Sequence, residues 1–142
     1  TALKSLRNFI QKSNTTGKTL IFQKYFKIKW DYRVLVVGGK ALGVMKRTAK
    51  KGEWRTNFSL GGMVAPASGK NIQNIKKLAE ITAQKMELDY VGVDILESEK
   101  KLHLIEVNPL AQFEGFEKSF HNINVAAEVI KLIEKRIRKI KE

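Results

Sequence analysis

Two short, mostly apolar runs that flank a polar stretch constrain the fold of this chain more than any other feature. The runs cover residues 90–96 and 102–107, and the residues between them are polar. Runs of this length on either side of a turn are typical of two β-strands joined in a hairpin. The sequence therefore predicts an antiparallel hairpin, with Glu99–Lys101 as its loop.

Each run contains one acid where a buried strand should be apolar. With this loop, Asp94 faces Glu106 across the two strands. Strand alternation places Asn108 on the same face. Like charges directly opposite each other destabilise a sheet, so we expect a cation to offset them. Carboxylate and amide oxygens suit Mg²⁺ beside substrate phosphates, and the hairpin therefore predicts a metal site formed by Asp94, Glu106 and Asn108.

The alternative is that both acids are ordinary solvent-facing strand residues. The neighbouring sequence argues against it, because Val93 and Ile95 flank Asp94. On the second strand, Ile105 directly precedes Glu106. An acid in such apolar sequence is usually paired with a partner or functional.

Length and composition favour one soluble globular domain. The chain has 142 residues, of which 43% are hydrophobic, and it has no cysteine. No run reaches the roughly 18 apolar residues that a transmembrane helix needs, so we expect no membrane partner. The start of the chain also lacks the pattern of a signal peptide. These observations predict a cytoplasmic protein without disulfides.

The formal net charge is +13, which is typical of proteins that bind negatively charged partners. The basic residues are spread along the chain, and their densest cluster covers residues 131–141. Basic residues near the C-terminus of a helix also complement its dipole, so this cluster is not by itself a nucleic-acid site. A phosphate-bearing substrate is compatible with the charge.

The remaining pattern alternates strands and helices. The predicted elements are a strand over 19–26, a hairpin of 33–37 and 41–48 that turns at Gly38 and Gly39, a loop over 54–62, an amphipathic helix over 71–86 and a last helix that Asn122 or Asn124 caps. The apolar residues of the last helix, including Ile133 and Ile140, are expected to face inward. Hairpins with helices at the ends predict an α+β fold with an antiparallel sheet, not a doubly wound α/β fold.

Three arginines lie in or near these strands: Arg33, Arg47 and Arg55. The planar guanidinium is permanently charged and suits phosphate and carboxylate groups. A single arginine would be most simply explained as a surface or salt-bridged residue. Three arginines among strands that also carry two acids favour a charged pocket.

Several motifs follow one another at characteristic separations. They are Asp31–Lys40, Trp54–Asn57, Gly61–Gly62, Gly92–Asp94, Glu106–Asn108 and Phe113–Glu117. With these motifs in this order, the chain resembles the ATP-grasp ligases. It most resembles their RimK-like branch, which contains the ribosomal-protein glutamate ligases. The resemblance covers about residues 20–130.

The resemblance implies an ATP-dependent carbon–nitrogen ligase. Such an enzyme phosphorylates a carboxylate and joins the acyl phosphate to an amine, using ATP and Mg²⁺, with Mn²⁺ as a substitute. The expected amino acid is glutamate, and the acceptor carboxylate belongs to a small molecule or a protein C-terminus. The alternative is a basic nucleotide- or RNA-binding module without catalysis. The facing acids favour the ligase, because a polyanion binder gains nothing from them.

Roles for single residues also follow from the resemblance. Asp94 and Glu106 would bind Mg²⁺, with Glu106 bridging two ions and Asn108 completing the second. Arg33 and Arg47 would be catalytic by stabilising phosphates or the acyl phosphate. The nucleotide-binding residues would be Gln23, Lys24 and Tyr25 on the adenine segment, the acid Asp31, and Arg55, Thr56 and Asn57 beside the neighbouring loop.

The chain departs from the family at several points, among them a short segment between Tyr25 and Asp31 and fewer small residues after Asn108. Lys24 stands where relatives carry an acid, and the glycine-rich loop and N-terminal substrate domain of the family have no counterpart. We therefore expect a partial ATP-grasp domain that is inactive by itself. Residues 1–30 would end the smaller subdomain and supply the adenine strand, and residues 31–142 would form the larger metal-binding subdomain. Homo-oligomerisation of the full-length protein is left open.

Overall fold

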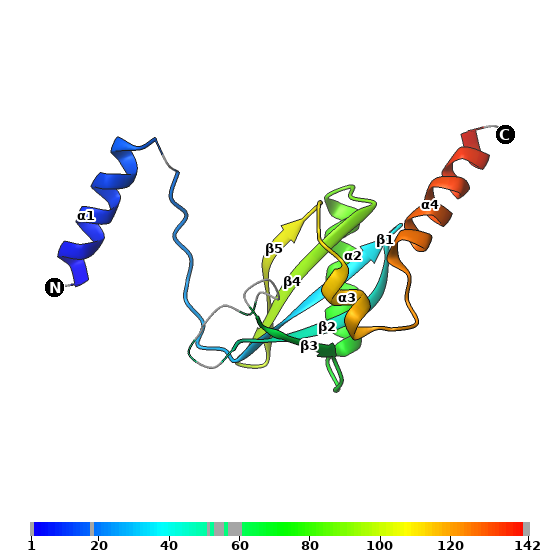
Figure 1. Ribbon diagram of the computed structural model, residues 1–142, viewed down its shortest axis with the longest axis horizontal. Helices are drawn as coiled ribbons and strands as arrows, with labels where there is room; N and C mark the ends of the chain where they lie inside the picture. Colours follow the sequence, from blue (N-terminus) through cyan, green and yellow to red (C-terminus); the bar gives the residue numbers. More distant parts are fainter. Residues whose placement is uncertain (1, 18, 51, 53–55, 57–60, 141–142) are drawn as a thin grey trace.

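The computed structural model describes residues 2–17, 19–50, 52, 56 and 61–140. A five-stranded antiparallel sheet, in the order β3-β2-β1-β4-β5, forms its centre, as Figure 1 shows. The elements in chain order are α1 (Ala2–Thr15), β1 (Trp30–Val37), β2 (Lys40–Thr48), β3 (Met63–Pro66), α2 (Ile72–Lys85), β4 (Tyr90–Ser98), β5 (Lys101–Asn108), α3 (Glu114–Ser119) and α4 (Val125–Ile140). The predicted α+β class is confirmed.

Both predicted hairpins form, and both turn through two residues with positive φ. Gly38 and Gly39 have φ of 58° and 78°, as expected for a turn that needs left-handed residues. At the second hairpin, the turn residues are Glu99 and Lys100, with φ of 53° and 61°. The predicted three-residue loop is therefore wrong, because a two-residue turn of this kind matches the twist of the strands better.

A bulge in β5 restores the predicted pairing of the acids. Near the turn, Ile95 lies opposite Leu104, but the next pair is Asp94 with Glu106, so Ile105 has no partner. An extra residue of this kind is a β-bulge. The facing acids are thus confirmed, although they are reached by a shorter turn and a bulge.

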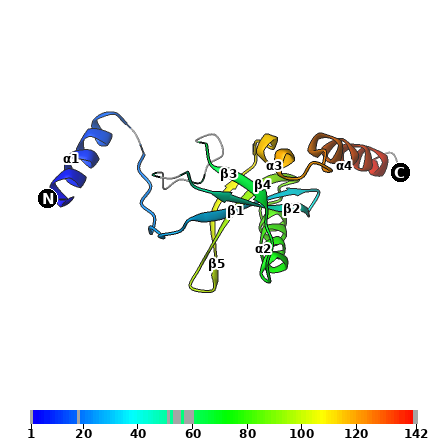
Figure 2. The same cartoon turned by 60° about the horizontal axis from the view of Figure 1, so that its bottom comes forward.

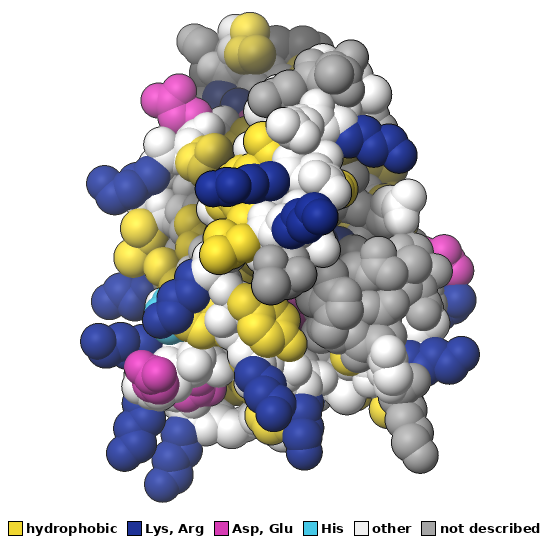
Figure 3. Space-filling view, turned by 90° about the vertical axis from the view of Figure 1, so that its left-hand side faces the viewer, with side chains coloured by type: hydrophobic (Ala, Val, Ile, Leu, Met, Phe, Trp, Pro, Cys, Tyr) yellow, Lys and Arg dark blue, Asp and Glu magenta, His cyan; other side chains and the backbone are white. Residues whose placement is uncertain are grey.

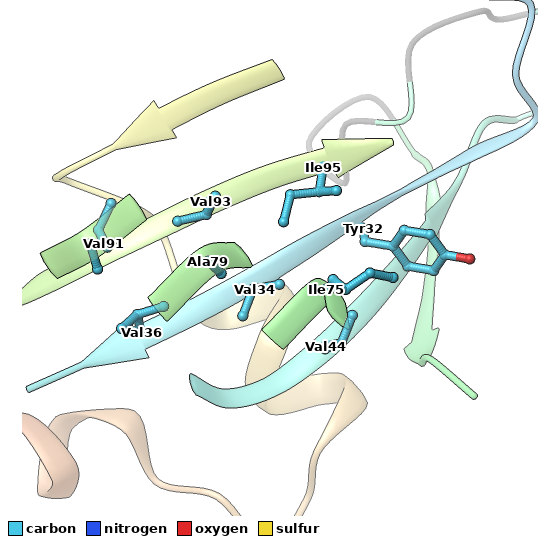
Figure 4. Close-up of a cluster of buried hydrophobic side chains, with 10 residues drawn as sticks. Tyr32, Val34, Val36, Val44, Ile75, Ala79, Val91, Val93 and Ile95 are labelled. Carbon is cyan, nitrogen blue, oxygen red and sulfur yellow. The ribbon is translucent and has the colours of Figure 1, made fainter. Parts of the chain in front are cut away.

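One face of the sheet packs on α2 and forms the main core. Figure 4 shows side chains from β1, β2 and β4 that point toward Ile75 and Ala79 of the helix. The buried residues of this cluster are Tyr32, Val34, Val36, Val44, Ile75, Ala79, Ala83, Val91, Val93 and Ile95. They alternate along each strand, as expected for a sheet with one face in the core.

The other face of the sheet is covered only in part. Figure 2 shows α2 and α3 on opposite sides of the sheet. Beneath α3 lies a second apolar cluster, formed by Leu35, Met45, Ala111, Phe116 and Val125. The close fit of α3 depends on Gly43, because a Cβ atom there would lie 2.9 Å from the ring of Phe120. The uncovered end of this face carries the charged residues.

The predicted strand over residues 19–26 is wrong. These residues have no regular secondary structure, and β1 begins only at Trp30. In Figure 1 the segment runs as an extended connection from α1 to the sheet. Ile21 and Phe22 are 82% and 68% exposed. The composition of the segment suits a strand, but a strand also needs a neighbour that pairs its backbone groups.

The last helix begins as predicted but is buried less. Asn124 is the cap, because its Oδ1 accepts a hydrogen bond of 2.8 Å from the backbone N–H of Ala127. Val125 is fully buried, whereas Ile133 and Ile140 are 50% and 84% exposed, so the expected inward direction of these two residues is wrong. The helix leaves the body of the molecule after its first turns (Figure 1). Within the described residues, no helix combines the length and the apolar character that crossing a membrane requires.

Candidate functional site

Neighbouring strands bring four charged side chains together on the face opposite α2. Arg33 on β1 lies directly across from Asp94 on β4, and Asp31 on β1 lies across from Arg47 on β2. We call Asp31, Arg33, Arg47 and Asp94 the charged quartet. Their positions follow from strand alternation, since the residues between them on β1 and β4 belong to the core.

Arg33 and Asp94 form a two-pronged ion pair. The Nε atom of Arg33 donates to Oδ1 of Asp94 at 2.7 Å, and Nη2 donates to Oδ2 at 2.8 Å. The two parallel bonds make this the stronger and more directional kind of arginine–carboxylate contact. Asp94 is only 3% exposed, so the pair is shielded from water.

Arg47 links the two acids of the quartet. It donates to Asp31 through Nε at 2.8 Å and Nη2 at 2.6 Å, and Nη2 also lies 2.9 Å from Oδ2 of Asp94. Burial alone would lower the pKa of Arg47, but its hydrogen bonds and charge contacts with Asp31 and Asp94 outweigh burial and raise it. Arg47 therefore remains a cation throughout the accessible pH range.

Asp31 has a further hydrogen-bond partner. The hydroxyl of Thr56 donates to its Oδ2 at 2.7 Å, and both residues are buried. Thr56 thus joins the quartet from the segment that follows β2. Arg55 and Asn57, which the sequence assigns to the nucleotide, lie outside the described residues, as does most of the predicted loop over 54–62.

The cations that offset the charge of Asp94 come from the sheet itself. The sequence predicted a bound metal for this purpose, but Arg33 and Arg47 already contact both of its oxygens. In the described parts of the chain, no three His, Cys, Asp or Glu side chains are grouped so that they could hold a metal ion. The donor set expected from the sequence has only two residues of these four types, Asp94 and Glu106, because Asn108 carries an amide.

Glu106 and Asn108 lie on the same face, as predicted, at the edge of the sheet. Glu106 is exposed opposite Asp94, and Asn108 pairs with Gly92 in the ladder. The Oδ1 atom of Asn108 accepts a hydrogen bond of 2.9 Å from the backbone N–H of Leu110. The carboxylate of Asp94 on β4 and the carboxylate and amide of Glu106 and Asn108 on the edge strand therefore lie on one face, and their oxygens are a donor set suited to a hard cation.

A hollow of about 400 Å³ opens beside these residues. Its wall includes Gln23, Lys24, Tyr25, Phe26, Ile28, Asp31, Arg47, Thr56, Asp94, Leu96, Ile105 and Glu106. The predicted adenine segment thus shares the wall of the hollow with the acids, although it is not a strand. A mostly apolar wall with a few charged groups is typical of a small-molecule site.

Aromatic contacts hold the adenine segment against β5. The ring of Phe26 lies 4.6 Å from that of His103, centroid to centroid. The ammonium group of Lys24 lies 5.1 Å from the centroid of Phe26, within range of a cation–π contact. Lys24 therefore lies in the wall of the hollow, where the resemblance led us to expect an acid.

Sequence reasoning missed a close contact beside Arg33. A Cβ atom at Gly92 would lie 2.6 Å from that of Ala111, so only glycine fits at this position in β4. The Tyr90 hydroxyl also donates to the carbonyl oxygen of Ala111 at 2.5 Å. Burial raises the pKa of Tyr90, with Arg33 opposing the rise. A glycine inside a strand was the available signal, since it often marks a close backbone approach.

Comparison with known sequences gives a consistent family. Residues 2–133 match the RimK-like ATP-grasp domain. The chain is 36% identical over 118 residues to a probable alpha-L-glutamate ligase of Citrobacter koseri, which covers 82% of this chain and 38% of that protein. It is 35% identical over 118 residues to the ribosomal protein bS6–L-glutamate ligase of Escherichia coli O81, with the same coverage. The chain thus spans less than half the length of these relatives.

Solved structures share the fold at low sequence identity. The D-alanine–D-alanine ligase of Bacillus anthracis, complexed with ATP, has a TM-score of 0.72 at 15% identity and covers 98% of this chain and 49% of its own. The ATP-grasp ligase PsnB, complexed with a phosphomimetic precursor variant, Mg and ADP, has a TM-score of 0.59 at 18% identity, covering 79% and 34%. These structures share the fold, and the match of residues 2–133 to the family's model shows that the chain belongs to the RimK-like ATP-grasp family.

Proposed function

We propose that this chain is the C-terminal portion of an ATP-dependent ligase that joins a carboxylate to the amine of an amino acid. The observation that carries the proposal is the pairing of Asp94 with Glu106 beside a hollow that also exposes Arg47. The names of the two sequence relatives support glutamate as the amino acid. The whole activity would require the additional length that those relatives have.

The proposed reaction has two steps. An oxygen of the acceptor carboxylate forms a bond to the γ-phosphorus of ATP, and the bond to ADP breaks. The amine nitrogen then attacks the acyl carbon, phosphate leaves with the bonding electrons, and the nitrogen loses a proton to solvent. Negative charge gathers on phosphoryl oxygens in the first step and on the departing phosphate in the second. Positioned cations are the main protein contribution to such chemistry.

Asp94, Glu106 and Asn108 would hold Mg²⁺, with Mn²⁺ as a substitute. Their oxygens are the ligand type that Mg²⁺ prefers when it also binds phosphate. A bound divalent cation would neutralise phosphate charge and help to align the groups that react. Glu106 is the exposed member of the set, so it can turn toward the hollow without breaking a buried contact.

Arg33 and Arg47 would stabilise the phosphates and the acyl phosphate. Gln23, Lys24 and Tyr25 would hold the adenine base through their backbone groups, which fits their place in the wall of the hollow. Arg55, Thr56 and Asn57 would contribute to nucleotide binding from the neighbouring segment. Asp31 borders the same hollow, but its oxygens already accept hydrogen bonds from Arg47 and Thr56, so we propose that it contributes by holding Arg47.

The domain division expected from the sequence remains part of this proposal. Residues 1–30 would close the smaller subdomain, and residues 31–142 would form the larger one. The chain alone should then release no ADP in response to amine, whereas the full-length protein should. ADP release by the purified chain would contradict this part of the proposal.

A basic nucleotide- or RNA-binding module is the other function that the charge suggests. On the side of the molecule in Figure 3, Lys and Arg side chains are spread among apolar ones. Two facing acids would weaken the attraction for a polyanion, so we favour the ligase. A binding module would retain ATP without amine-dependent ADP release, which distinguishes the two functions in one assay.

The sharpest test of the ligase is Glu106→Gln in the full-length protein. Glutamine keeps the size and one oxygen ligand but removes the charge that would balance the metal at the phosphoryl group. We expect kcat to fall by about 100-fold or more, with a smaller loss of ATP affinity. Lys135→Ala, on the exposed side of α4, is the control and should change neither quantity. A near-normal kcat for Glu106→Gln would exclude Glu106 as a metal ligand and with it the proposed mechanism.

A further inference from the structure

The carboxylate of Asp94 has little room for an additional ligand. A carboxylate offers about four lone-pair positions. Three of them accept hydrogen bonds: Arg33 donates to each oxygen, and Arg47 donates to Oδ2. Because the residue is also 3% exposed, a metal can approach both oxygens only if a guanidinium moves away.

The two arginines differ in how firmly they are held. Arg47 has a second acid, Asp31, and its side chain is 5% exposed. Both side-chain hydrogen bonds described for Arg33 end on Asp94, and its side chain is 15% exposed. Losing the contact with Asp94 therefore leaves Arg47 paired and frees Arg33. Arg33 is therefore the arginine that a metal ion could displace from Asp94.

The charge of the quartet also opposes a free metal ion. The two acids and two arginines of the quartet sum to zero, and Glu106 opposite Asp94 adds only one negative charge, which does not balance a dication. A nucleotide brings further negative charge in its phosphates. Guanidinium binds phosphate as well as carboxylate, so a bound phosphate offers Arg33 an equivalent partner.

We propose that Arg33 makes metal binding at Asp94 depend on bound nucleotide, by occupying the carboxylate until a phosphate group takes the guanidinium. This inference rests on the proposed function, because it takes Asp94 as a metal ligand. Nucleotide and metal then strengthen each other's binding by the same factor, as linkage requires. Without bound nucleotide, the site would therefore bind free divalent ions only weakly.

The test measures Mn²⁺ binding to the full-length protein by electron paramagnetic resonance, with and without ADP. The wild type should bind Mn²⁺ weakly alone and at least about tenfold more tightly with saturating ADP. Arg33→Gln should raise the affinity for Mn²⁺ without ADP by about tenfold, because it frees Oδ1 of Asp94, leaves only Arg47 on Oδ2 and gives the quartet one net negative charge. Asp31 and Arg47 stay paired in this variant, which protects the fold.

Three further variants make the result specific. Arg33→Lys keeps the charge and should leave Mn²⁺ binding without ADP weak. Arg136→Gln removes the same charge from a remote surface pair with Asp89, and it should behave as the wild type. Asp94→Asn should abolish the ADP-dependent Mn²⁺ binding.

The outcomes separate this inference from the proposed function. Tight Mn²⁺ binding by the wild type without ADP, lost in Asp94→Asn, would overturn the inference and keep the metal site. Unchanged binding in a folded Arg33→Gln would also overturn it. If Asp94→Asn binds Mn²⁺ and ADP as the wild type does, both the inference and the proposed metal site fail. If Arg33→Gln does not fold, tight Mn²⁺ binding by the wild type without ADP still overturns the inference.

Discussion

The two faces of the sheet use the same strands for opposite purposes. On β1, Val34 and Val36 point into the core beneath α2, while Asp31 and Arg33 point to the other side. The same alternation on β4 separates the core valines from Asp94. The face beneath α2 is held by apolar contacts, which are not directional, whereas the end of the other face that α3 leaves uncovered is held by ion pairs, which are directional.

This difference affects how each face can change. A core residue is held by many apolar contacts that do not depend on direction. An apolar substitution of similar volume keeps most of them and is usually tolerated. Arg47 has two partners at fixed distances, and no other side chain of the quartet can take its place between Asp31 and Asp94. We expect the charged face to be the less forgiving of the two.

The largest effect should follow from Arg47→Met. This change leaves Asp31 buried without its cation, and breaking a buried pair in this way costs about 3–5 kcal/mol of unfolding free energy. Lys40→Met, at an exposed position on the same strand, makes the same change of charge and should cost little. Urea denaturation measures both. Equal small losses would mean that the charged face contributes no more to stability than the surface does.

An intermediate effect is expected for Ile75→Ala on the core face. Ile75 is fully buried beneath the sheet, so truncation should lower the unfolding free energy by about 3 kcal/mol. Ile81→Ala, at a 39% exposed position of the same helix, is the control and should cost clearly less. Mn²⁺ affinity with ADP should be unchanged in both folded variants. A large change in that affinity would show that the two faces are not independent.

The smallest effect should come from Gly92→Ala on the charged face. Its new Cβ would lie 2.6 Å from that of Ala111, and relieving such overpacking costs about 1–3 kcal/mol. The double variant with Ala111→Gly removes the clash and should regain part of the lost stability in the same denaturation measurement, less the cost of the buried methyl group of Ala111. A single variant as stable as the wild type would show that the loop carrying Ala111 adjusts without cost.

The sequence predicted what depends on local pattern. Alternation and turn residues located both hairpins and α2, and they placed Asp94 opposite Glu106. Local pattern does not say that β1 lies beside β4, because these strands are far apart in the chain and α2 lies between them. Because β1 lies beside β4, Arg33 contacts Asp94. The sequence identified Arg33 and Arg47 as residues of a charged pocket but not the acids that they contact.

The failures have physical causes of the same kind. The segment over residues 19–26 has strand-like composition, but its backbone has no strand beside it in the described fold. Ile133 and Ile140 continue the apolar side of α4 beyond the point where the helix leaves the sheet. In both cases the local pattern describes the apolar character of the side chains but does not predict whether another element packs against them.

The unpaired residue in β5 has a consequence for comparing this hairpin with others. The ladder near the turn runs from Ser98–Lys101 to Ile95–Leu104, and Ile105 separates it from the pairs that begin with Asp94 and Glu106. A chain that lacked Ile105 would form a continuous ladder with the same turn and the same facing acids. The hairpin therefore contains one spare residue, and an alignment of relatives can place a one-residue gap here without losing the correspondence of either acid. A single-residue deletion at Ile105 would thus be absorbed between the turn and the acids, and Asp94 and Glu106 would still face each other.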